Sequence, residues 1–373
     1  LNRVGLRSLV KSYTAYDVEA ALVVYYDDRQ WRLSYICNLR DGKTAPKRFT
    51  YLFGNPDETY RTPVDRFLLL RNKGVTPENI YEAFSVEKLN ADFFNGYKAQ
   101  FRKFCAYIGG REKWQRDYVK KLLGRLVFLQ FLQKKGWMGV PSEARGWTGG
   151  DANYMRTLLD RHKGNDRLLA EVLELLFFET LNRKREDDLA DPLLGDRIRI
   201  PYLNGGLFDR DALDRNRIDF PYAYFDELIE FFAQYNFTID ENDPDDSEVG
   251  IDPEMLGHIF ENLLEDNKDK GTFYTPKEIV QYMSRESLIQ YLRTHTDEAV
   301  HAAVGRLIRT GEVDPALQNP KVAARLDTLL REVKVCDPAI GSGAFPMGVL
   351  GEISKCRRVL YGFTKRREAF SPS

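Results

Sequence analysis

The spacing of hydrophobic residues divides the chain into a β-rich beginning and a long helical middle. Residues 21–36 (ALVVYYDDRQWRLSYI) hold two runs of β-branched and aromatic residues around an Asp-Asp-Arg turn, and residues 48–53 (RFTYLF) are a third such run. These runs predict a hairpin and one further strand. We therefore expect residues 1–84 to form a small β-rich domain.

From residue 85 onward apolar residues recur at steps of three and four, which is the spacing of one buried helix face. The clearest such face consists of Val119, Leu122, Leu123, Leu126 and Val127. This helix is predicted to end near Gly136, and further helices are predicted over residues 166–181 and 224–235. Residues 85–270 are therefore expected to be a large helical connector domain.

Turn-forming and capping residues mark the next boundaries. Residues 242–250 (NDPDDSEVG) are acidic and predict a surface loop. Asp252 and Thr275, each followed by a proline, supply an N-cap and a first-turn residue for two more helices. After a further helical stretch, residues 333–338 (VKVCDP) predict a buried strand that enters a new sheet.

Composition narrows the class of protein. Hydrophobic residues make up 43% and charged residues 30% of the chain, and no apolar run approaches the roughly 20 residues of a membrane-spanning helix. We expect a cytoplasmic protein without membrane contact. The cysteines Cys37, Cys105, Cys336 and Cys356 lack C-x-x-C spacing, which argues against a metal site or a disulfide framework.

Charge gives no general support for nucleic-acid binding, because 55 basic and 56 acidic residues leave a formal net charge of -1. A DNA-binding surface would have to be local. The candidate basic residues are Lys103, Arg111, Lys113, Arg116, Lys120, Lys121, Arg125, Lys134 and Lys135. Such runs are also typical of ordinary solvated helix faces.

A glycine-bearing turn at residues 337–345 (DPAIGSGAF) is the leading candidate for chemistry. Gly341 and Gly343 let the backbone approach a ligand without a Cβ, and the amides of the following helix can face polar groups. The turn lacks the Gly-Lys-Ser/Thr ending of a phosphate loop, and Pro346 stands at the third position of G-x-G-x-x-G. By itself it also fits a purely structural strand-to-helix turn.

GTFYTPKEIVQYM followed later by VCDPAIGSGAF resembles the N6-adenine DNA methyltransferases of restriction-modification systems. In that family a [F/Y]-Y-T-P segment and a D-P-A-x-G-S-G-x-F segment occur together. The order found here is similar to the gamma arrangement of type I modification subunits and of type IIG enzymes. The segments YLNGGLFD, YNFTIDENDP and VGIDPEMLGHIFENLLED resemble the helical region that precedes the methylase fold in the type IIG group.

The resemblance implies a mixed α and β fold, in which residues 271–373 begin a doubly wound, Rossmann-like α/β methyltransferase domain. It implies S-adenosylmethionine as cofactor, double-stranded DNA as partner and a possible specificity domain or subunit, with no metal required. The implied cofactor-binding residues are Thr272, Phe273, Tyr274, Thr275, Pro276, Asp337, Pro338, Ala339, Gly341, Ser342, Gly343 and Phe345.

Two features of the family are missing from the sequence. After the glycine turn we find neither an acidic residue suitably placed for the ribose hydroxyls nor the Asn/Asp-Pro-Pro-Tyr/Phe motif that grips the flipped adenine; Glu352 and Glu368 are badly placed for the first role. Extrusion of a base requires unstacking energy and a dedicated pocket. We therefore expect a truncated portion of the enzyme that has no catalytic residues and is inactive alone.

Two alternatives stay open. Type IIG enzymes fuse a nuclease to the methylase, so residues 1–84 are either a nuclease-like remnant or a spacer. Carboxylates near the predicted strands are Asp17, Glu19, Asp27 and Asp28. The literal D/E-x-K matches, Asp41 with Lys43 and Asp266 with Lys268, lie in a predicted turn and a charged loop instead of a strand. The second alternative is a non-catalytic module that binds DNA or a partner.

Overall fold

The protein is described by a computed structural model. It places residues 20–26, 31–37, 47–53, 61–147, 149–203, 205–238, 246–251, 257, 275, 277–338, 340 and 343–363. The chain divides into two compact units, Leu1–Leu264 and Glu265–Ser373. The boundary expected after residue 84 lies inside the first unit.

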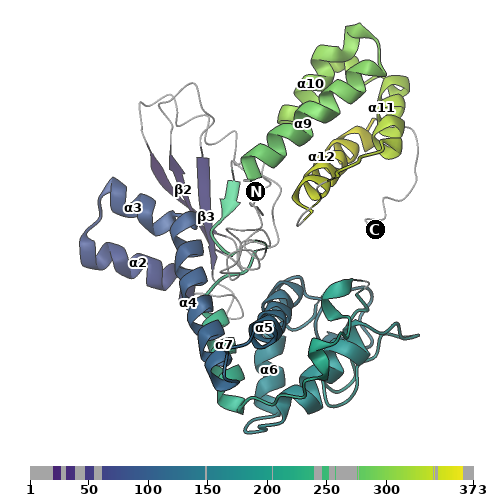
Figure 1. The fold of residues 1–373 in the computed structure, drawn as a ribbon. Coiled ribbons are helices and arrows are strands. Elements are labelled where there is room, and N and C mark those ends of the chain that lie inside the picture. Colours follow the sequence, from purple (N-terminus) through teal and green to yellow (C-terminus); the bar gives the residue numbers. More distant parts are fainter. Residues whose placement is uncertain are drawn as a thin grey trace. The chain divides into compact units, whose positions relative to one another are not determined.

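A four-stranded sheet in the first unit has the order β1-β2-β3-β6 (Figure 1). Its strands are β1 (Ala21–Tyr26), β2 (Trp31–Cys37), β3 (Lys47–Phe53) and β6 (Asp246–Glu248). The first three strands pair antiparallel, whereas β6 runs parallel to β3. The predicted hairpin and third strand are confirmed.

Strand β6 corrects the expectation of a surface loop for residues 246–250, while residues 242–245 of that predicted loop lie outside the described residues. The Val249 amide donates to the Thr50 carbonyl at 2.8 Å, and Val249 and Ile251 are fully buried. A short, acidic edge strand limits unwanted pairing with other chains. The sequence did not reveal it because Asp-Ser-Glu is too short and too polar to show an alternating apolar pattern.

Three helices follow the first strands: α2 (Arg61–Lys73), α3 (Pro77–Phe84) and α4 (Val86–Tyr107). Helices α2 and α3 pack on the sheet through aromatic side chains. The Tyr51 ring of β3 lies 5.3 Å from the Phe67 ring and 5.0 Å from the Phe84 ring, measured between centroids. The Tyr51 hydroxyl donates to the Ala83 carbonyl at 2.7 Å. The sheet and the helices therefore share one core.

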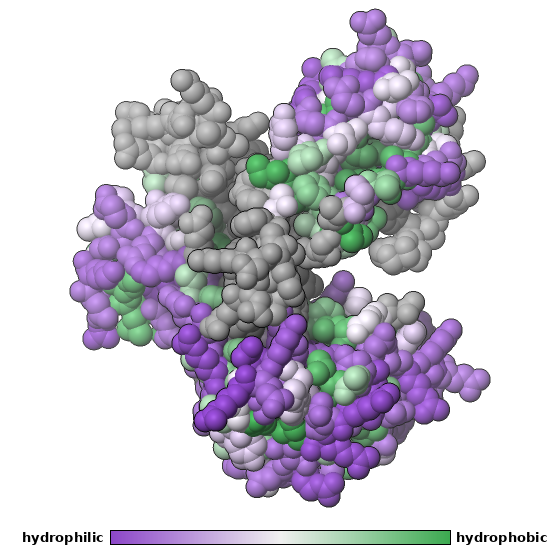
Figure 2. Space-filling view, viewed as in Figure 1, coloured by the Kyte–Doolittle hydropathy of each residue, from purple (hydrophilic) through white to green (hydrophobic). Residues whose placement is uncertain are grey.

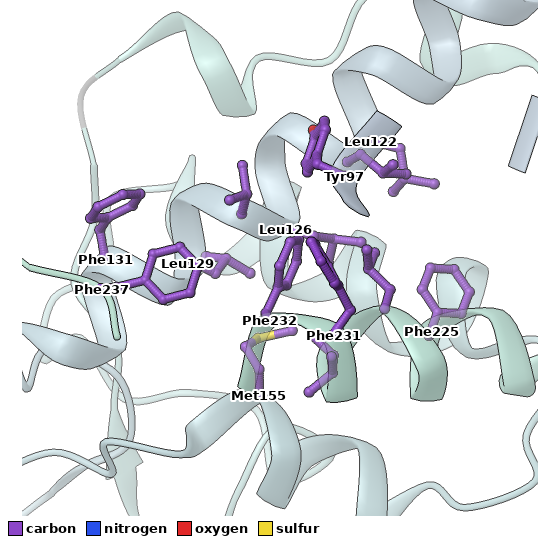
Figure 3. Packing of buried hydrophobic residues seen from close by; sticks show 14 of the residues in the cluster. Tyr97, Leu122, Leu126, Leu129, Phe131, Met155, Phe225, Phe231, Phe232 and Phe237 are labelled. Carbon is purple, nitrogen blue, oxygen red and sulfur yellow. The ribbon is translucent and has the colours of Figure 1, made fainter. Parts of the chain in front are cut away.

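The helical middle contains α5 (Lys113–Lys134), α6 (Tyr154–Arg161), the π-helical stretches η2 (Leu169–Leu173) and η3 (Leu175–Leu181), and α7 (Tyr222–Ala233). Small connecting elements are β4 (Val140–Pro141), β5 (Ile198–Arg199), η4 (Gly206–Phe208) and η5 (Leu213–Arg215). The predicted buried face of α5 is confirmed, since Val119, Leu123 and Leu126 are fully buried. Aromatic residues of α7 pack against α4 and α5 in this core (Figure 3).

The second unit, as far as it is described, is helical. It consists of α9 (Lys277–Thr294), η7 (Glu298–Val300), α10 (His301–Thr310), η8 (Pro315–Leu317), α11 (Pro320–Glu332) and α12 (Ala344–Tyr361). Its own core includes Ile289, Val304 and Leu326, all fully buried. In neither unit is any described helix both long and apolar enough to cross a bilayer.

The strand predicted over residues 333–338 is wrong. This segment has no regular secondary structure, and Val335 is 53% exposed. A strand needs a neighbour that satisfies its backbone N–H and C=O groups, and the described part of the second unit contains no strand. The doubly wound sheet therefore stays a prediction.

Candidate cofactor site at two helix ends

The helices that follow the two sequence motifs lie side by side (Figure 1). Gly348 in α12 faces the beginning of α9: a Cβ built on it would lie 2.6 Å from Val280 Cγ1 and 3.0 Å from Ser284 Oγ. Farther along both helices, Arg285 Nε donates to Glu352 Oε1 at 2.9 Å. Because the contacting residues advance in the same direction, the helices are parallel and begin at the same end of the pair.

The turn that begins α12 needs a glycine. Gly343 has φ 86°, in the left-handed region that side chains with a Cβ avoid. Its amide donates to the Ile340 carbonyl at 2.7 Å, and its carbonyl accepts from the Met347 amide at 3.1 Å. Among the residues that the structure describes, none has an atom within 4 Å of a Cβ built on Gly343, so these residues leave the space beside the turn open.

Of the predicted cofactor-binding residues, the structure describes Thr275, Asp337, Pro338, Gly343 and Phe345. Thr275 comes just before α9, Asp337 and Pro338 precede the glycine turn, and Phe345 lies in the first turn of α12. Both groups flank helix N-termini at the same end of the pair. The predicted residues outside the described part are Thr272, Phe273, Tyr274, Pro276, Ala339, Gly341 and Ser342.

Sequence reasoning missed a polar connection between α9 and α12. The Arg285 and Glu352 side chains are only 18% and 9% exposed. Cys356, one turn beyond Glu352, is also buried; burial and then the Glu352 carboxylate raise the pKa of its thiol to about 12. The available signal was an Arg and a Glu next to the buried faces of two predicted helices, which does not identify them as partners.

A second polar cluster, in the first unit, is structural. Arg125 Nη1 donates to Asp214 Oδ1 at 2.7 Å, while its Nε donates to the Leu207 carbonyl at 2.9 Å. Lys121 Nζ lies 2.8 Å from Asp214 Oδ2. Burial opposes ionisation of Asp214, but the bonds from Arg125 and Lys121 outweigh it and lower its pKa to about 2. The GGLFD turn is thus fixed to α5 by the backbone contacts of Arg125.

This cluster changes the interpretation of the basic residues predicted as a DNA surface. Arg125 is buried, and Lys121 also pairs with Asp211 at 2.7 Å. Lys134 Nζ donates to Asn236 Oδ1 at 3.2 Å. Since several members are engaged within the unit, the predicted set does not form one freely solvated basic face.

The described residues contain no group of three or more His, Cys, Asp or Glu side chains that could hold a metal ion. His162, His295 and His301 each contact a backbone carbonyl through a ring nitrogen. These contacts account for the three histidines as structural residues. The carboxylates and lysines named for a nuclease, Asp17, Glu19, Asp27, Asp28, Asp41, Lys43, Asp266 and Lys268, lie outside the described residues.

Comparison with known proteins identifies a relative of this chain. The chain is 27% identical over 266 residues, 66% of its length, to a protein of Methanocaldococcus jannaschii named "Putative type II restriction enzyme and methyltransferase". This chain is similar to a restriction-modification protein. The match spans 21% of that protein's length. No family model matches the chain, and no solved structure matches it.

Proposed function

We propose that this chain provides the S-adenosylmethionine-binding part of a DNA adenine-N6 methyltransferase of a restriction-modification system. The observation that carries the proposal is the parallel pairing of α9 and α12. Each helix follows one of the two motifs, and both helices begin at the same end of the pair. The relative's name supports the class of reaction. The order of the Tyr-Thr-Pro and DPAIGSGAF segments supports adenine as the base and S-adenosylmethionine as the methyl donor.

The residues at this end fit the methionine portion of that cofactor. Helix N-termini present unpaired N–H groups and a positive dipole end, which suit a carboxylate. The open space beside Gly343 leaves room for a ligand against the backbone, and Asp337 provides an acidic group close in sequence. Thr275 and Phe345 would flank the ligand from the two helix beginnings.

The role assigned to this chain is binding and orientation. When bound, S-adenosylmethionine supplies a methyl group on a positively charged sulfur. The protein's contribution is to fix the direction of that group, because orientation supplies much of the rate gain in a direct transfer. Residues 1–373 contain no Asn/Asp-Pro-Pro-Tyr/Phe motif, so we assign no catalytic residue among them.

Calorimetric titration of the chain with S-adenosylmethionine tests this proposal. The parent should bind saturably, the Gly341→Asp variant should not bind, and Gly351→Ala should bind like the parent. Gly351 is the matched control because it lies in α12 and a Cβ built on it meets no atom within 4 Å. Absence of binding to the parent, or equal binding to Gly341→Asp, would contradict the proposal.

DNA cleavage is the second candidate, because the relative's name also includes a restriction enzyme. The described strands β1, β2 and β3 carry no acidic residue. A metal-dependent nuclease would therefore have to draw its carboxylates from elsewhere, such as Asp41 beside Lys43. Magnesium-dependent cutting of plasmid DNA that disappears in Asp41→Ala would support this candidate, and no cutting by the parent would remove it.

A further inference from the structure

The close contact between α9 and α12 does not by itself fix how far one helix is displaced along the other. At Gly348 the contact consists of the glycine backbone of α12 on one side and the Val280 and small Ser284 side chains of α9 on the other. A displacement by one helical turn is about 5.4 Å. Such a displacement would move the beginning of α12 away from the beginning of α9, and with it one motif away from the other.

The Arg285–Glu352 ion pair is the polar contact that can define this displacement. Its Nε–Oε1 distance of 2.9 Å joins one position on α9 to one position on α12. Buried ion pairs are poor sources of net stability, because desolvation offsets the attraction, and their best-supported role is to specify register.

Two buried polar atoms beside this contact also support a role in register. Among the residues that the structure describes, Glu352 Oε2 of this pair is buried without a hydrogen-bond partner from the protein, and the neighbouring Ser284 Oγ is too. Each such atom costs free energy that an apolar side chain would not. A contact retained at this cost is better explained by geometry than by stability.

We propose that Arg285 and Glu352 fix the axial register of α9 and α12. They thereby keep the beginnings of the two helices, which follow the two motifs, at the same position along the pair. They are positioning residues, since neither belongs to the residues proposed to flank the cofactor. The register is a property of the described helices alone; its consequence for S-adenosylmethionine rests on the proposed function.

Pulsed electron paramagnetic resonance measures the register directly. Nitroxides would be attached through p-acetylphenylalanine in place of Tyr282 on α9 and Tyr361 at the end of α12, which are 67% and 40% exposed. This chemistry leaves the natural cysteines untouched. The test variant is Arg285→Met with Glu352→Met, which replaces the ion pair by apolar side chains of similar length.

The matched control is Arg357→Met with Asp327→Leu. That pair joins α12 to α11 at 2.8 Å, and both side chains are 28% exposed. We expect one narrow distance in the parent and the control. The test variant should show a second distance shifted by about one helical turn, 5.4 Å, or a broadened distribution, while its urea midpoint is not lowered.

An unchanged distance in the test variant would overturn the inference, as would an equal change in the control. Cofactor affinity is a separate readout: Kd for S-adenosylmethionine should rise at least about tenfold in the test variant and stay unchanged in the control. If the parent binds no cofactor, the proposed function fails, and the distance measurement still decides the register.

Discussion

Three glycines near the beginning of α12 differ in whether, and why, the structure requires a glycine at that position. Gly343 needs the left-handed backbone, with φ 86°. Gly348 needs to lack a Cβ, because that atom would lie 2.6 Å from Val280 Cγ1, whereas a Cβ at Gly351 would meet nothing within 4 Å. The sequence predicted the importance of the first glycine from its turn. It did not distinguish the other two, because their difference depends on a neighbouring helix.

The two helical glycines give opposite predictions for stability. Gly348→Ala forces α9 and α12 apart and should lower the free energy of unfolding of the second unit by about 1–3 kcal/mol. Gly351→Ala should raise it by roughly 0.5–1 kcal/mol, because alanine loses less backbone entropy in a helix. Urea unfolding followed by circular dichroism measures both. Equal effects of the two variants would contradict the close contact at Gly348.

Asp214 makes the free energy of unfolding of the first unit depend on pH in the acidic range. Its folded pKa of about 2 lies below the usual value near 3.9, so its ion pair stabilises fully above pH 3.9 and the contribution is lost as the pH falls toward 2. Asp214→Asn leaves Arg125 buried without its partner. We expect it to lower the free energy of unfolding at pH 7 by about 3–5 kcal/mol and to flatten the decline between roughly pH 4 and pH 2.

The exposed Arg161–Asp196 pair is the control for this prediction. Asp196 is 75% exposed and lies 3.0 Å from Arg161, and exposed pairs add little stability. Asp196→Asn should therefore leave both the stability at pH 7 and its pH dependence nearly unchanged. Urea unfolding measured across the pH range compares the two variants, and similar losses in both would show that burial of Asp214 is not the cause.

At the scale of elements, long periodic segments could be predicted and short ones could not. The hairpin follows from runs of β-branched and aromatic residues around a turn, and α5 follows from a helical apolar face. Strand β6 has no such pattern. It is defined by its pairing with β3, which the spacing of apolar residues does not show. The predicted helix over residues 166–181 contains the π-helical stretches η2 and η3, for which apolar spacing at three and four residues gives no signal. The strand at residues 333–338 was wrongly predicted because its composition says nothing about whether a pairing strand is present.

The burial beside β6 can be tested with matched valines. Val249 is fully buried, whereas Val75 is 74% exposed. Val249→Ala removes two buried methyl groups and should lower the free energy of unfolding of the first unit by about 2 kcal/mol, while Val75→Ala should have little effect. Chemical unfolding of both variants measures this difference. A loss as small as that of Val75→Ala would mean that this segment does not pack on the sheet as described.

For the whole molecule, the sequence predicted the two motifs, and the resemblance implied that they lie together at one cofactor, which stays a prediction. Both the Tyr-Thr-Pro segment and the glycine turn could be recognised from residue order alone. The pairing of the helices that follow them depends on contacts of Gly348 with Val280 and of Arg285 with Glu352, which are separated in sequence and carry no common pattern. Apolar side chains also remain exposed on the second unit, including Ile279, Met347 and Leu350 (Figure 2).

Each unit has its own core, so we expect the two to lose structure separately. Asp214→Asn should lower the unfolding midpoint of the first unit only, and Gly348→Ala that of the second only. Tryptophan fluorescence reports the first unit, because Trp31, Trp114, Trp137 and Trp147 all lie in it. Circular dichroism reports both. A single transition shifted equally by both variants would show that the units unfold together.

We propose that the segments before α9 and α12 form one S-adenosylmethionine site. Hydrogen exchange measured by mass spectrometry, with and without saturating cofactor, tests it most directly. We expect slower exchange in peptides covering residues 271–283 and residues 337–350 together, no change in peptides of α5 and α7, and loss of the effect in Gly341→Asp. Slower exchange in only one of the two segments, or in neither, would contradict the claim.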